Sequence, residues 1–163
     1  MGCGRVVGNR GPGVLPTLNW SVLNFFVPGR PSPQGSKRSV GNGRFIEASK
    51  YLPAWRKAVT EYAIYAATEH GWDTLHGPVT LEVVFYMERP SSIKQSKRPH
   101  PVVPPDIDKL CRAIGDSLSD AGVWGDDSQV VKLVAFKRYA DNHEQGAFIS
   151  VSTLDENDTL NLS

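Results

Sequence analysis

The strongest pattern of hydrophobic and polar positions lies in residues 104–128. Apolar residues recur there at three- and four-residue spacing, which places them on one face of an α-helix: Ile107, Leu110, Cys111, Ile114 and Leu118. Pro105 and Asp106 favour a helix start, and Gly122 follows the last apolar turn, where helices commonly end. The pattern therefore predicts a helix with a defined beginning and end.

A second helix is predicted over residues 50–70. Pro53 lies in its first turn, and His70 and Gly71 close it. Apolar residues again recur at helical spacing: Leu52, Trp55, Val59, Tyr62, Ala63 and Ala66. We interpret this stripe as core rather than as a platform for stacking bases.

Four segments have the pattern of β-strands. Residues 20–28 form an apolar run that Pro28 ends, and residues 129–139 and 147–153 are predicted to pair as a hairpin. Residues 78–88 alternate with period two, so their apolar side chains point one way: Val79, Leu81, Val83, Phe85 and Met87.

The remaining segments are rich in turn residues. We expect a disordered tail over residues 1–20, a folded domain over 21–154 and a frayed acidic tail over 155–163. Within the domain, residues 29–45 and 89–105 are predicted to be long loops.

Length and composition fit one globular domain. The chain has 163 residues, of which 40% are hydrophobic and 21% charged. Two cysteines, Cys3 and Cys111, are too few for a disulfide framework or a thiolate zinc site. No apolar run is long enough to span a membrane, and we expect a cytoplasmic protein.

Charge is unevenly distributed although the net charge is +1. Residues 1–50 hold seven Lys/Arg against one acid, whereas residues 101–150 hold five against eight acids. A basic half beside an acidic cluster suits a bound polyanion, although for the charge asymmetry alone solvated loops are the better explanation. The candidate phosphate contacts lie in the two loops: Lys37, Arg38, Arg44, Lys94, Lys97 and Arg98.

The predicted helix of residues 104–128 carries candidate metal ligands at both ends. Asp106 and Asp108 lie at its start, and Asp126 and Asp127 lie in the turn that follows it. Carboxylates brought together repel one another, and a divalent cation relieves this; oxygen ligands favour Mg²⁺, with Mn²⁺ as an alternative. Such a site suits phosphodiester hydrolysis. Taken singly, each pair is more commonly a helix cap or a turn.

Together these motifs resemble the RusA family of Holliday-junction resolvases, small endonucleases of phage and prophage origin. The resemblance rests on Pro-Asp-Ile-Asp-Lys-Leu, then an amphipathic helix, then Val-Trp-Gly-Asp-Asp-Ser-Gln-Val-Val. The stretch Phe-Val-Pro-Gly-Arg-Pro-Ser-Pro-Gln-Gly-Ser-Lys is similar to the N-terminal strand and loop of phage members. The resemblance to the family extends over roughly residues 24–153, and its most specific part is residues 105–131.

The resemblance implies a homodimeric α+β fold with one small mixed sheet and two main helices. It also implies Mg²⁺-dependent resolution of four-way DNA junctions by paired nicks, in a bacterial host or a phage-infected cell. By position, Asp106, Asp108 and Asp127 match the family's metal-binding carboxylates, and Asp126 is a neighbouring candidate.

Arg112 occupies a position where the family commonly has lysine, four residues after Asp108. Arginine stays protonated, so it is a poor proton acceptor. We expect it to stabilise charge on the attacked phosphate; the alternative is a surface ion pair with Asp108. Two other classes stay open: a non-enzymatic DNA-binding or phage assembly protein, and a catalytically inactive relative.

Overall fold

The computed structural model describes residues 22–35, 37–47 and 49–154, so both predicted tails lie outside the described residues. No helix in this part of the chain is long and apolar enough to cross a membrane. In chain order the elements are β1 (Val22–Pro28), β2 (Lys37–Ser39), β3 (Phe45–Glu47), α1 (Leu52–Glu69), β4 (Val79–Met87), α2 (Ile107–Asp120), the short 3₁₀ helix η1 (Asp127–Gln129), β5 (Val130–Tyr139) and β6 (Gly146–Thr153).

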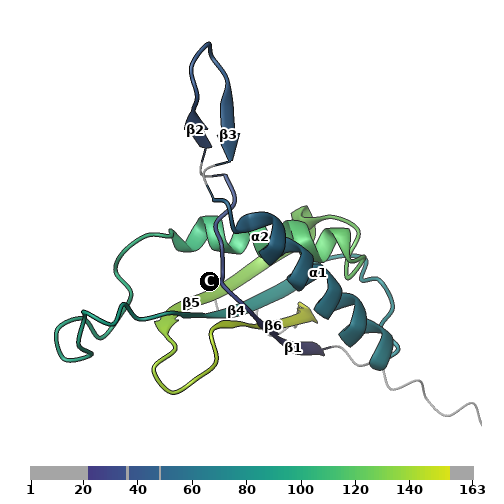
Figure 1. The fold of residues 1–163 in the computed structure, drawn as a ribbon. Coiled ribbons are helices and arrows are strands. Elements are labelled where there is room, and N and C mark those ends of the chain that lie inside the picture. The colour runs from purple at the N-terminus through teal and green to yellow at the C-terminus, as the bar shows by residue number, and fades with distance from the viewer. Residues whose placement is uncertain (1–21, 36, 48, 155–163) are drawn as a thin grey trace, which may run out of the picture.

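Four strands form one mixed sheet in the order β1-β6-β4-β5, and both α-helices lie on the same face of it (Figure 1). β6 is antiparallel to β1 and β4, whereas β4 and β5 are parallel. The parallel pair is connected through α2, because parallel strands need a crossover connection. The predicted α+β class, with a small mixed sheet and two main helices, is therefore confirmed.

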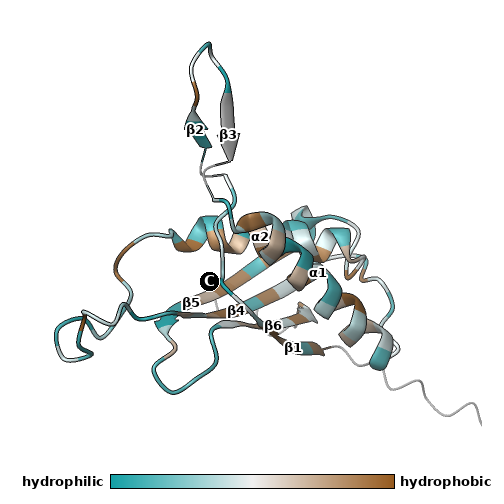
Figure 2. Ribbon diagram, viewed as in Figure 1, coloured by the Kyte–Doolittle hydropathy of each residue, from teal (hydrophilic) through white to brown (hydrophobic). Residues whose placement is uncertain are grey.

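The core lies between the sheet and the two helices. As the alternation predicts, the odd-numbered apolar residues of β4 from Val79 to Met87 are buried. The predicted stripe of α1 is buried except for Tyr62, which is 42% exposed. Hydrophobic residues recur along the strands and on the helices, whereas the outer part of the loop that follows β4 is mostly hydrophilic (Figure 2).

The predicted hairpin between residues 129–139 and 147–153 is wrong. β6 pairs with β1 and β4, and β5 pairs only with β4 at the edge of the sheet. The burial pattern is consistent with this order, since Ala147, Ile149 and Val151 of β6 are fully buried, as is common in a central strand. β5 exposes side chains such as Leu133, which suits an edge position.

The predicted loop over residues 29–45 also contains structure that the pattern did not reveal. β2 and β3 pair as an antiparallel hairpin that projects from the body of the protein (Figure 1). Its tip is made by Gly41, Asn42 and Gly43, with φ of 87°, 49° and 69°. Glycine and asparagine tolerate this left-handed backbone, and Asn-Gly is a common hairpin turn. The strands are too short to show an apolar alternation.

Gly146 is predicted to be essential for the packing of β6 against β1. A Cβ at this position would collide with the Val27 carbonyl oxygen and come within 2.7 Å of the Phe26 ring. Gly146→Ala should therefore lower the free energy of unfolding by ~1–3 kcal/mol, as overpacking does, and reduce the Tm in thermal denaturation. Gly41→Ala is the control for backbone strain alone, because its φ is 87° and nothing lies within 4 Å of its added Cβ. An equal or larger loss in the control would contradict the packing explanation.

Candidate acidic site on helix α2

The first acid pair lies at the exposed N-terminus of α2. Asp106 is the N-cap residue, with φ −69° and ψ 140°, and Asp108 lies in the first turn. The Asp106 side chain makes no capping hydrogen bond, contrary to expectation; instead its Oδ2 lies 3.1 Å from Lys109 Nζ. Both carboxylates lie at the helix N-terminus, whose partial positive charge attracts anions.

The two acids of the second pair have different surroundings: the Asp126 carboxylate is a helix cap, whereas the Asp127 carboxylate faces α2. Asp126 caps η1: its Oδ1 accepts a hydrogen bond of 2.8 Å from the backbone N–H of Ser128. Hydrogen bonding from the Ser128 side chain, followed by that from its backbone N–H, lowers the pKa of Asp126. Asp127 turns toward α2 instead, since a Cβ placed on Gly115 would lie 3.6 Å from the Asp127 Cβ.

Gly115 places Asp127 on the same face of α2 as Asp108. It follows Asp108 by seven residues, which is two helical turns and hence the same face of α2. The buried position of Gly115 leaves room for the Asp127 side chain against the helix. The turn after α2 thus returns to the helix face that presents Asp108.

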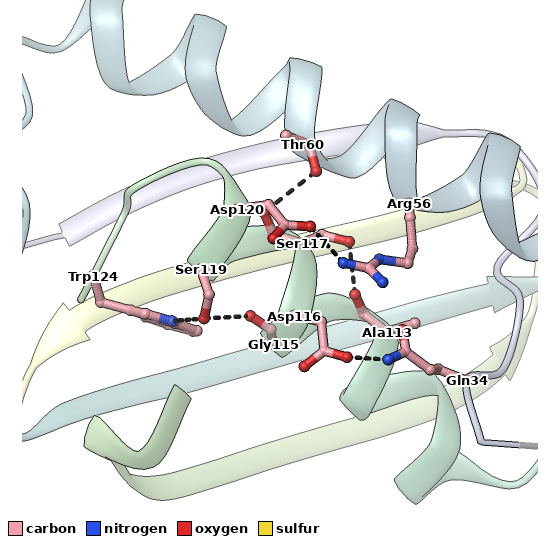
Figure 3. Close-up of polar contacts among 10 residues, drawn as sticks. All are labelled: Gln34, Arg56, Thr60, Ala113, Gly115, Asp116, Ser117, Ser119, Asp120 and Trp124. Carbon is pink, nitrogen blue, oxygen red and sulfur yellow. Dashed lines mark hydrogen bonds and ion pairs between the residues drawn. The ribbon is translucent and has the colours of Figure 1, made fainter. Parts of the chain in front are cut away.

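Trp124 holds this turn against α2. Its ring is 1% exposed, and its Nε1 donates to Ser119 Oγ at 2.8 Å. Ser119 Oγ in turn donates to the Gly115 carbonyl oxygen at 3.1 Å (Figure 3). The hydrogen bonds link the turn to the helix residue that Asp127 contacts.

Gln129 closes the other side of the turn. Its Oε1 accepts from the backbone N–H groups of Gly125 and Asp126, at 2.8 and 3.0 Å. Its Nε2 donates to the carbonyl oxygens of Leu75 and Gly77, at 3.0 and 2.9 Å. Sequence reasoning missed both Trp124 and Gln129, although Asp126 and Gln129 have the spacing of a capping box.

The loop after β1 packs along the same helix. Gln34 N–H donates to the Lys109 carbonyl oxygen at 3.0 Å, and its side-chain amide donates to Asp116 (Figure 3). One residue further, a Cβ on Gly35 would come within 3.2 Å of Arg112 Nη1. Arg112 therefore extends toward this loop, and within the described residues it forms no ion pair with Asp108.

The donor set suits a hard cation in its chemistry, because all the candidate ligands are carboxylates. Within residues 22–35, 37–47 and 49–154, however, no three His, Cys, Asp or Glu side chains are grouped as a metal site. Mg²⁺ commonly takes only one or two protein carboxylates, with waters and substrate phosphates completing its shell. The exposed carboxylates of Asp106, Asp108 and Asp127 are compatible with that mode of binding.

The candidate DNA-binding cations lie on two projections. Lys37, Arg38 and Arg44 are exposed on the β2–β3 hairpin. Lys94 and Lys97 are exposed on the loop of residues 89–105, whereas Arg98 is partly buried with its guanidinium 6.0 Å from the Tyr139 ring. The loop is therefore anchored at Arg98 and presents its charges further out.

Arg89 fixes the base of this loop. Its Nε and Nη2 donate to the two carboxylate oxygens of Asp141 at 2.6 and 2.8 Å, and its guanidinium stacks 3.9 Å from the Tyr139 ring. The Arg89 hydrogen bonds lower the pKa of Asp141. This bidentate pair joins the start of the loop to the segment after β5.

Two comparisons place the chain among known proteins. Residues 28–152 match the family model described as Endodeoxyribonuclease RusA. The chain is also similar to "Uncharacterized protein YqaN" of Bacillus subtilis (strain 168), with 32% identity over 130 residues. That alignment covers 73% of this chain and 89% of the relative.

Gly115 is predicted to control the distance between Asp127 and α2. In Gly115→Ala the added methyl makes an ordinary contact with Asp127, and loss of a helical glycine should stabilise the protein by ~0.5–1 kcal/mol. Gly115→Leu should displace the turn and lower the Tm below that of wild type. Thermal denaturation of both variants measures this. If Gly115→Leu were as stable as Gly115→Ala, the turn would not pack on this face of α2.

Proposed function

The chain belongs to the RusA family of endodeoxyribonucleases, and we propose that it resolves four-way DNA junctions by Mg²⁺-dependent nicking at the acidic site of α2. The observation that carries this proposal is the placement of Asp127 against Gly115, on the helix face that also presents Asp108. The order of acids around α2 is the part of the sequence in which the likeness to the family is most specific.

In the proposed site, Asp106, Asp108 and Asp127 would hold Mg²⁺ or Mn²⁺, and Asp126 would remain chiefly a cap. When bound, the ion supplies Lewis-acid stabilisation of a phosphodiester and a water of lowered pKa. The carboxylates are exposed, so a DNA phosphate can approach them from solvent.

Arg112 supplies positive charge to the same region. It stays protonated at neutral pH, so it cannot serve as a general base. Its guanidinium lies beside Gly35 of the loop after β1. In the proposed function it stabilises charge that develops on the attacked phosphate, and the neighbouring loop limits the directions in which it can extend.

The two basic projections suit a branched DNA substrate. The β2–β3 hairpin and the loop of residues 89–105 extend away from the body near the N-terminal end of α2 (Figure 1). Lys and Arg on such arms bind phosphates without reading sequence. In this proposal they hold DNA arms on either side of the acids.

We also propose that two copies act together through the edge strand β5. Its outer edge has no neighbour among the described strands, and it exposes Val131 (60%), Leu133 (51%) and Phe136 (57%). Exposed apolar edge strands pair readily with another strand. A two-fold dimer would present two acidic sites to a junction of matching symmetry, which accounts for paired nicks.

Substitution by Asn should distinguish the role of Asp127 from that of Asp126. Asp127→Asn and Asp108→Asn are expected to abolish nicking of a mobile four-way junction while preserving junction binding. Asp126→Asn should retain most activity, because asparagine also caps helices. Nicking with Mg²⁺ and with EDTA, mapped on all strands, measures this.

Three outcomes of this assay would contradict the proposal. Normal cutting by Asp108→Asn would show that Asp108 is not required for nicking, contrary to its assigned role. Greater damage from Asp126→Asn than from Asp127→Asn would invert the roles of the two acids. Binding of junctions by wild type without any Mg²⁺-dependent nicking would favour the non-enzymatic DNA-binding class or an inactive relative.

The proposed dimer can be tested at one residue of β5. Leu133→Arg should convert a dimer to a monomer, as measured by size-exclusion chromatography with light scattering. Val22→Arg is the matched control, because Val22 is 43% exposed on β1 at the opposite edge of the sheet. A monomeric wild type, or dissociation caused only by the control, would show that β5 is not the interface.

A further inference from the structure

A cleft of about 990 Å³ lies beside the start of α2. Its walls come from segments that are distant in sequence: the loop after β1, the residues just before α1, and the proline-rich residues 101–105. Asp106 and Lys109 of α2 also line it. The cleft therefore adjoins the first acid pair and shares Asp106 with it.

Positive charge dominates the lining. The cleft holds two acids, Glu88 and Asp106, against five cations: Arg30, Arg38, Lys50, Lys109 and Lys137. Lys109 pairs with Asp106, and Lys137 donates to two backbone carbonyl oxygens of the proline-rich segment. The other three cations form no ion pair with any described residue. Their charge is available to an anion.

Tyr51 lies among these cations. The Arg30 guanidinium carbon is 4.1 Å from its ring centroid and Lys50 Nζ is 5.0 Å from it, and Tyr51 is 41% exposed. Proteins bind single-stranded nucleic acid with this combination, because bases stack on aromatic rings while cations contact the phosphates. An inorganic anion alone would make no use of the ring.

The size of the cleft restricts the ligand. Its volume is within the range of pockets that enclose small ligands, roughly 300–1,000 Å³, which suits one or two nucleotides rather than a longer segment of DNA. A second hollow of about 620 Å³ shares Asp106 and Lys137 with the cleft and adds Asp108 to the lining. A strand that continues from the cleft into this hollow would lie beside Asp106 and Asp108.

We propose that this cleft binds one or two unpaired nucleotides of the DNA strand adjacent to the phosphate presented to the acids. The inference rests on the proposed function for the presence of a DNA substrate. It adds a binding site of its own, which selects strands that are unpaired, or easily unpaired, next to the cut. Tyr51 stacks a base, and Arg30, Arg38 and Lys50 hold the backbone.

The test measures binding without metal, so it does not depend on catalysis. Fluorescence anisotropy of labelled dT3 and dT10 is recorded with the full chain in EDTA at several salt concentrations. We expect salt-dependent binding of dT10 that falls at least 10-fold in the double variant Arg30→Gln/Lys50→Gln and ~5-fold or more in Tyr51→Leu. The matched control Lys57→Gln/Arg138→Gln removes the same charge from exposed residues outside the cleft and should change affinity less than 2-fold.

Two further arms define the ligand. Free dTMP should displace labelled dT10 far more weakly than unlabelled dT3, because a strand has several phosphates to contact. Photo-crosslinking of a 5-iodo-deoxyuridine oligonucleotide, mapped by mass spectrometry, should modify Tyr51 in the wild-type protein. The second arm needs no substitution and holds even if a variant loses stability.

The proposal is overturned if the cleft variant and its charge-matched control weaken dT10 binding equally, if dTMP competes as well as dT3, or if crosslinks avoid the cleft. Junction nicking is measured separately on the same variants. Specific strand binding without nicking would uphold this cleft and reject the proposed function. Junction nicking without cleft-dependent strand binding would support the proposed function and reject the cleft as a strand-binding site.

Discussion

The candidate site depends on how the turn after α2 is held against the helix. Trp124 is buried beneath this turn and donates to Ser119, while Gln129 accepts from two backbone amides and donates to two backbone carbonyls. A hydrogen-bond network whose side-chain donors and acceptors have partners favours one arrangement of the chain. Here that arrangement is the approach of Asp127 to Gly115.

The acids around α2 consequently have different environments. Asp126 is engaged as a cap, and Asp106 is paired with Lys109. Asp108 and Asp127 are exposed, and no described ion pair involves either of them. Residues 126–129 thus serve both the turn and the candidate site: Asp126 and Gln129 maintain the turn, which directs Asp127 toward the helix.

Elements with long periodic patterns could be predicted from the sequence. The alternation of β4 and the apolar stripe of α2 each describe a surface that must be buried, so both appeared where expected. The partner of β6 could not be predicted, because alternation shows that a strand is half-buried but does not identify its neighbours. The β2–β3 hairpin was missed because three-residue strands carry too little pattern.

The candidate site was predictable in part for similar reasons. The acids could be identified as candidates by their spacing around one helix. The anchoring roles of Trp124 and Gln129 depend on contacts with Ser119 and residues 75–77, which spacing does not reveal. The cationic cleft joins segments near residues 30, 50 and 103. Only the folded chain brings them together, since the sequence predicted two of these segments as loops and the third as the start of a helix.

The central claim is that acids from both ends of α2 share one ion when DNA is present. Titration of Mn²⁺ followed by electron paramagnetic resonance, with protein bound to a nuclease-resistant four-way junction, tests this most directly. The account predicts that wild type acquires a Mn²⁺ site that Asp108→Asn and Asp127→Asn each eliminate. Unchanged Mn²⁺ affinity in Asp127→Asn would show that the turn contributes no ligand and would contradict the account.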